Sequence, residues 1–154
     1  MRVARRRGRL LLQLEPAEAD VLLMLFDELD ALLDGDGDDA VLERLNPAAY
    51  PDDEPAEREY RALTAESLHT ARNERTAACR ADLSRSRDVE LSDPDTGKRW
   101  IQVLNDLRLA LGTRLGITED DDHNFDADEP AGRPRFIYYW LTALQDELVQ
   151  GLMH

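Results

Sequence analysis

The stretch from Arg99 to Ile117 constrains the fold most, because apolar residues recur along it at steps of three and four. This spacing places them on one face of a helix. Ile101 and Leu109 widen the face beyond that of a surface helix, and Gly116 stands where a left-handed cap would end it. The pattern therefore predicts a helix at the centre of the fold. Its main apolar face consists of Trp100, Val103, Leu104, Leu107, Leu111 and Leu115.

The rest of the chain predicts elements that surround this helix. Residues 9–14 and 88–91 alternate as short strands do, and Val41 lies in a segment long enough for one or two helical turns. A chain of 154 residues can bury a core without disulfides. We therefore predict one mainly α domain, a bundle of four to five helices around a central Trp100–Leu115 helix, with a small two-stranded β ribbon. The remaining long helical segments are residues 16–33, 56–83 and 135–152.

Charge divides the chain into acidic and basic segments. There are 33 acidic and 19 basic residues, which give a net charge of −14. Acidic residues dominate 34–39 and 118–134, which we predict to be surface loops, whereas residues 1–8 form a predicted basic N-terminal arm. The negative charge disfavours nucleic acid and anionic membranes, so nucleic acid is expected to bind weakly if at all. Arg5, Arg6, Arg7 and Arg9 are candidate contacts for phosphate or for a partner.

The sequence contains no recognisable targeting or catalytic signal. It shows no secretory leader and no apolar run near the roughly 20 residues that span a bilayer, so we predict a cytoplasmic protein without membrane contact. Loops beginning at Asp34 and Asp120 have calcium-loop spacing in their first halves but lack the glutamate that should close the site. His69, His123 and His154 have no metal-ligand spacing. We predict no enzymatic activity, metal or cofactor.

Cys79 is the only cysteine, which makes an intramolecular disulfide impossible. Two interpretations of it stay open. Arg75 and Arg80 lie near it in sequence, and positive charge would lower the pKa of the thiol and make it redox-sensitive. The favoured interpretation is a small residue of the core.

Polar residues interrupt the apolar pattern of the central helix at Asn105, Asp106 and Arg108. They predict either a polar network within the fold or a contact with a partner. Pairing with charged residues of the 56–83 helix is favoured, because buried polar groups need partners.

The C-terminal helix carries large apolar groups around its whole circumference between Phe136 and Leu141. One domain surface can cover only part of them. Either the N-terminal ribbon covers the remainder, or a second copy of the chain does so in a homodimer. The predicted dimer contacts are Ile137, Tyr138 and Leu141.

Four stretches together resemble a known family over nearly the whole chain. It is an actinobacterial family of unknown function, whose genes often lie beside the gene for the ClpS proteolytic adaptor and near cysteine-synthesis genes. Some members are described as transcriptional regulators that respond to oxidative stress. The stretches are Leu14-Glu15-Pro16 after the first strand, residues 44–50, residues 59–64 and, above all, Trp100–Gly112.

This resemblance implies a regulatory protein that acts through protein contacts. Its expected partner is the transcription machinery, in an oxidative-stress or cysteine-metabolism response. The alternative is an accessory protein of ClpS- or Clp-linked regulated proteolysis. The lone Cys79 departs from any switch that needs two thiols.

Overall fold

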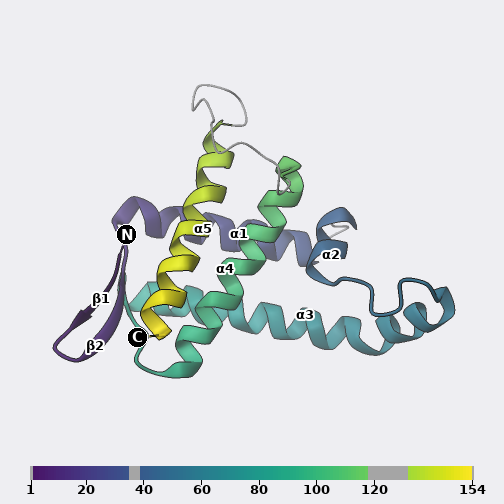
Figure 1. The fold of residues 1–154 in the computed structure, drawn as a ribbon, viewed down its shortest axis with the longest axis horizontal. Helices are drawn as coiled ribbons and strands as arrows, with labels where there is room; N and C mark the ends of the chain where they lie inside the picture. Colours follow the sequence, from purple (N-terminus) through teal and green to yellow (C-terminus); the bar gives the residue numbers. More distant parts are fainter. Residues whose placement is uncertain (1, 35–38, 118–131, 154) are drawn as a thin grey trace.

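The computed structural model describes residues 2–34, 39–117 and 132–153. Within these ranges five helices and three strands are present, and Figure 1 shows the helices gathered around α4 with the strands at one end. This confirms the predicted mainly helical bundle. The strands are β1 (Arg2–Arg6), β2 (Arg9–Gln13) and β3 (Asp88–Glu90); the helices are α1 (Pro16–Asp34), α2 (Asp39–Leu45), α3 (Glu54–Arg85), α4 (Pro94–Leu115) and α5 (Gly132–Met153).

Helix α4 occupies the centre, as its sequence predicts. It packs against α1, α2, α3 and α5, and Trp100, Val103 and Leu104 are fully buried. The Trp100 ring lies 6.2 Å from that of Phe26, and its indole N–H donates to Asp82 Oδ2 at 2.9 Å. The only polar atom of the largest core side chain therefore has a partner.

Two glycines of α4 allow α5 to approach closely. A Cβ on Gly97 would lie 2.7 Å from the Leu152 side chain, and one on Gly112 would lie 2.8 Å from the Tyr138 ring. Both distances are shorter than packed carbon atoms tolerate. Gly97, which by propensity alone only weakens the first turn, therefore has a packing role. Gly116 caps the helix with a φ of 68°, as predicted.

The ribbon has three strands, where the sequence predicts two. They pair antiparallel in the order β1-β2-β3. The added strand comes from the expected N-terminal arm, which turns back at Arg7 and Gly8 with φ values of 53° and 80°. Two positive φ values match the tight turn that joins hairpin strands. The sheet packs its inner face on the core through Leu10, Leu12 and Val89.

Two helices bury only part of their apolar residues. In α3, Leu63 is 76% exposed and the buried residues begin at Arg72. Figure 1 shows the reason, since the N-terminal half of α3 extends beyond α4. In α5 the buried face contains Leu141, Leu144 and Leu148, whereas Phe136 is 56% exposed.

Replacing Leu107 by alanine should lower the free energy of unfolding by about 2–5 kcal/mol, because this side chain is 3% exposed and its loss leaves a cavity. Urea denaturation measures the change. Leu63→Ala, at an exposed position of α3, is the matched control and should change stability by less than about 0.5 kcal/mol. A loss below about 1 kcal/mol at Leu107 would contradict its central position.

Candidate functional site

A buried ionic cluster joins α3 to α4. Asp106 is 6% exposed, and its carboxylate lies 3.6 Å from Arg72 Nε and 3.5 Å from Arg75 Nη2. Burial raises the pKa of Asp106, while the two guanidinium groups oppose that rise. The predicted pairing of Asp106 with the 56–83 helix is confirmed. Asn105 and Arg108, by contrast, bond to each other, because Arg108 Nη2 donates a hydrogen bond to Asn105 Oδ1 at 3.1 Å.

Arg72 extends this cluster to the end of α2. Its two terminal nitrogens donate to Asn46 Oδ1 at 2.6 Å and to the Leu45 carbonyl at 2.7 Å. The carbonyl groups at the end of a helix have no partner within it, so a guanidinium is well suited there. One buried side chain thus fixes α2, α3 and α4 relative to one another.

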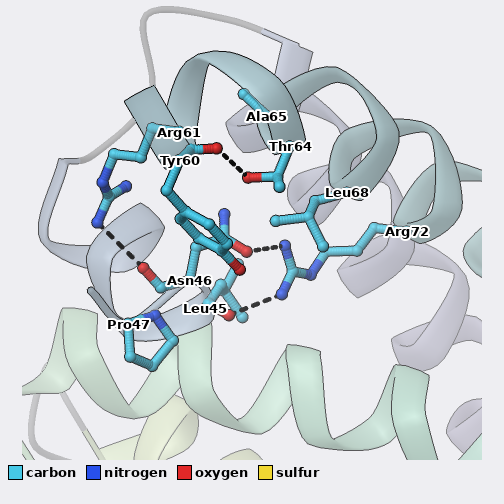
Figure 2. Close-up of a pocket in the computed structure, with 9 residues that line it drawn as sticks. All are labelled: Leu45, Asn46, Pro47, Tyr60, Arg61, Thr64, Ala65, Leu68 and Arg72. Atoms are coloured by element: carbon cyan, nitrogen blue, oxygen red, sulfur yellow. Dashed lines mark hydrogen bonds between the residues drawn. The ribbon is translucent and has the colours of Figure 1, made fainter. Parts of the chain in front are cut away.

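A pocket of about 350 Å³ opens between α3 and the segment that follows α2. Figure 2 shows the Tyr60 ring lying across it, with Arg72 bonded to Asn46 and Leu45 at its base. Arg61 also donates hydrogen bonds, from Nε to Glu57 Oε2 at 2.7 Å and from Nη2 to the Asn46 carbonyl at 3.2 Å. The nine lining residues include no carboxylate, histidine or cysteine, so they provide no pair for acid–base catalysis. The lining is Leu45, Asn46, Pro47, Tyr60, Arg61, Thr64, Ala65, Leu68 and Arg72.

Three exposed side chains with large apolar surfaces include Tyr60, which lines the pocket, and two of its neighbours. Tyr50 is 49% exposed, Tyr60 36% and Leu63 76%. The two tyrosine rings meet edge to face with centroids 6.1 Å apart, and Leu63 stands one helical turn from Tyr60. We call these three residues and the pocket the α3 patch. Sequence periodicity missed it, because an apolar helical stripe looks the same whether the chain covers it or leaves it exposed.

The predicted basic residues lie on the β1–β2 hairpin. Arg9 donates two hydrogen bonds to the Glu90 carboxylate, at 3.0 and 2.6 Å. Arg5, Arg6 and Arg7 are exposed, and in the part of the chain that the structure describes they form no ion pair. Arg5 also borders a groove of about 580 Å³ that extends to Lys98 on α4.

The structure corrects the redox interpretation of Cys79. Its side chain is fully buried, and burial raises the pKa of the thiol to about 12 even though Arg99 and Arg75 lower it. The sequence indicated a lowered pKa because it shows neighbouring charges but not the loss of solvent around sulfur. Cys79 is a core residue, in agreement with the favoured interpretation.

The proposed dimer contacts on α5 need a similar correction. Leu141 is fully buried inside the chain, and the Tyr138 ring covers Gly112 of α4. Ile137 remains at the surface, where it lines a shallow hollow of about 290 Å³ with Phe136 and residues of α1. We call this hollow the α5 patch. Its lining is Ala17, Glu18, Val21, Phe136, Ile137 and Trp140.

The described ranges hold no group of three or more histidine, cysteine or acidic side chains suited to an ion. His69 lies 3.0 Å from Asp34 Oδ1. His123, His154, residues 35–38 of the first calcium-like loop and the whole of the second lie outside the described residues. No helix described here is long and apolar enough to cross a membrane.

Residues 1–152 match the family described as "Domain of unknown function (DUF2017)". The chain belongs to the DUF2017 family. This match confirms the family resemblance seen in the sequence. The matched residues include both the α3 patch and the β1–β2 hairpin. No solved structure matches the chain.

Curated relatives of this DUF2017 chain carry a regulatory name. It is 34% identical over 129 residues to the "Putative oxidative stress regulator AosR" of Mycobacterium leprae, across 75% of this chain and 59% of the relative. It is 40% identical over 65 residues to the "Oxidative stress regulator AosR" of Mycobacterium bovis and of Mycobacterium tuberculosis H37Rv, across 42% of this chain and 29% of each relative. The matches thus span less than two thirds of each relative, and none of these names refers to Clp.

Native Cys79 should react with a thiol reagent such as dithiobisnitrobenzoate more than about 100-fold more slowly than in the urea-unfolded chain near pH 8. The reason is that the sulfur is inaccessible and its pKa of about 12 leaves little thiolate. Absorbance of the released thiolate measures both rates. Similar rates in the two states would contradict the core assignment.

The homodimer stays a prediction. We now expect its contact to be the α5 patch in place of Tyr138 and Leu141. Phe136→Glu places a charge on an exposed apolar position, so it should shift the molecular mass from dimer toward monomer. Sedimentation equilibrium at tens of micromolar measures this. Met153→Glu, 74% exposed at the other end of α5, is the control that should leave the mass unchanged. A monomer mass for the unmodified chain would remove the dimer.

Proposed function

We propose that this chain is a non-enzymatic regulatory protein that acts in the response to oxidative stress by binding another protein through the α3 patch. The exposed aromatic surface around the pocket is the observation that carries the proposal. The name "oxidative stress regulator" given to the mycobacterial relatives supports the regulatory part.

The composition of the α3 patch is typical of a protein contact. Tyrosine is enriched at such interfaces, because a large rigid ring buries much area with little loss of conformational entropy. Tyr50 and Tyr60 are held by their edge-to-face contact, so binding would order little that is not ordered already. The adjacent pocket gives a partner's apolar side chain a place to anchor.

The position of the patch also favours a partner. It lies where α3 extends beyond the bundle, so an approaching protein meets few other elements of the chain. The pocket's arginines are already bonded within the chain, and they therefore favour an apolar anchor over an anion. We propose a component of the transcription machinery as the partner, in keeping with the regulators that the family resemblance implies.

The chain's own thiol does not suit the role of sensor in this proposal. Cys79 is fully buried and the pKa of its thiol is about 12, so peroxide would meet neither an accessible nor an ionised sulfur. The stress signal would then reach this protein through the presence or modification of its partner.

Capture from native lysates of peroxide-treated and untreated cells, with the tagged chain as bait, tests the proposal. Mass spectrometry should find RNA polymerase or a sigma factor. Leu63→Glu should reduce the captured amount by about tenfold, since a buried charge at an interface costs more than 1.4 kcal/mol. Ala77→Glu adds the same charge at another exposed position of α3 and should capture as much as the unmodified chain. Equal capture by both variants, or capture of Clp components alone, would contradict the proposal.

A further inference from the structure

Strand β1 lies at one edge of the three-stranded sheet, and β2 is the one strand among the described residues that pairs with it. Arg6 and Arg9 are paired across the two-residue turn, which makes them a pair that exchanges both backbone hydrogen bonds. Bonded and non-bonded pairs alternate along an antiparallel ladder. The backbone N–H and C=O groups of Val3 and Arg5 therefore point away from β2, toward the open edge.

The bonds on the other side of β2 agree with this alternation. Leu10, which faces Arg5, uses its carbonyl to accept a hydrogen bond from the Leu91 N–H at 2.8 Å. Its backbone is thus turned toward β3, away from Arg5. Within the described ranges, no backbone bond joins Val3 or Arg5 to another element. Helix α5 covers the inner face of β1, where a Cβ on Gly151 would lie 2.6 Å from Val3 Cγ1.

Positive charge accompanies this open edge. Arg2 and Arg6 lie on the outer face of β1, Arg5 lies on its inner face, and Arg7 stands in the turn. All four are exposed, and among the described residues they have no carboxylate partner, whereas Glu90 neutralises Arg9. A second copy of β1 would bring arginines against arginines, so these charges oppose self-pairing at this edge.

We propose that the edge of β1 binds an acidic, extended segment of another protein as an added strand. The segment's backbone would bond to Val3 and Arg5, and its carboxylates would lie near Arg2, Arg5 and Arg6. Nucleic acid fits less well, because phosphate groups have no N–H to donate to the open carbonyls. The chain's net charge of −14 also repels nucleic acid. Screening limits the attraction of the hairpin arginines to short distances, so they do not offset this repulsion farther away. The inference goes beyond the proposed function, because Figure 1 places the hairpin and the free end of α3 at opposite ends of the molecule.

Fluorescence anisotropy with a labelled peptide of alternating glutamate and valine, about ten residues long, tests this site on the purified chain. Two matched peptides are compared with it, one with lysine in place of glutamate and one N-methylated at every residue, which removes the N–H groups from both of its edges. We expect both to bind at least about tenfold more weakly, since the first reverses the charge and the second blocks the backbone bonds. A labelled DNA duplex is the fourth probe and is expected to bind more weakly than the acidic peptide.

Protein variants separate the two parts of the site. Arg2→Glu with Arg6→Glu should weaken binding by about tenfold or more, whereas Arg44→Glu with Arg58→Glu changes the net charge equally at exposed positions elsewhere and should not. Arg5→Pro removes the outward N–H without breaking a bond to β2, and Arg5→Ala removes the charge alone. Arg5→Pro should therefore bind more weakly than Arg5→Ala. Circular dichroism and urea midpoints confirm that each variant is folded.

Four outcomes would overturn the proposal. They are equal affinity for the lysine peptide, equal affinity for the N-methylated peptide, equal affinity of Arg5→Pro and Arg5→Ala, and tighter binding of the DNA duplex. None of them bears on the α3 patch, and loss of capture in Leu63→Glu would not affect the hairpin result. The two proposals therefore fail separately.

Discussion

The bridge that Arg72 makes between Asp106, Asn46 and the Leu45 carbonyl determines how the helices are arranged. A guanidinium that is 9% exposed must be bonded, because an unpaired buried charge would cost several kcal/mol. The observed placement of α2 and α4 against α3 provides those partners. The bridge therefore fixes the direction in which the rest of α3 extends, and with it the position of the α3 patch. A network of this kind contributes to a unique structure more than to stability, since replacement of buried ions by apolar groups is often neutral.

Several elements were predictable because one physical effect dominates each. The apolar residues of α4 extend around so much of the helix that only a central position buries them, and Gly116 ends it by the conformation it alone adopts easily. The burial of Asp106 followed from a charged residue within an apolar stripe. The family was also evident from the central stretch. In each case the information is local in sequence.

What the sequence did not predict depends on contacts between distant segments. Strand β1 contributes one apolar side chain, Val3, to the core, so alternation did not reveal it, and its pairing with β2 defines it instead. The face of α5 was misjudged because its apolar groups surround the helix, and only packing against Gly97 and Gly112 selects the one that is buried. The pKa of Cys79 depends on burial, which outweighs the arginines that the sequence shows.

Net charge and local structure together explain how the two contact surfaces proposed for this acidic protein can differ in kind. With 33 acidic residues against 19 basic ones, the chain repels most macromolecules of the cell at long range, so any binding energy has to arise locally. At the α3 patch the binding energy would come from burial of tyrosine and leucine side chains. Salt strengthens this apolar contribution or leaves it unchanged. At the hairpin it would come from arginine charge, which screening weakens beyond about 8 Å at physiological ionic strength. Rising ionic strength would then weaken the hairpin contact but not the contact at the α3 patch, so a partner held by both would depend increasingly on the α3 patch.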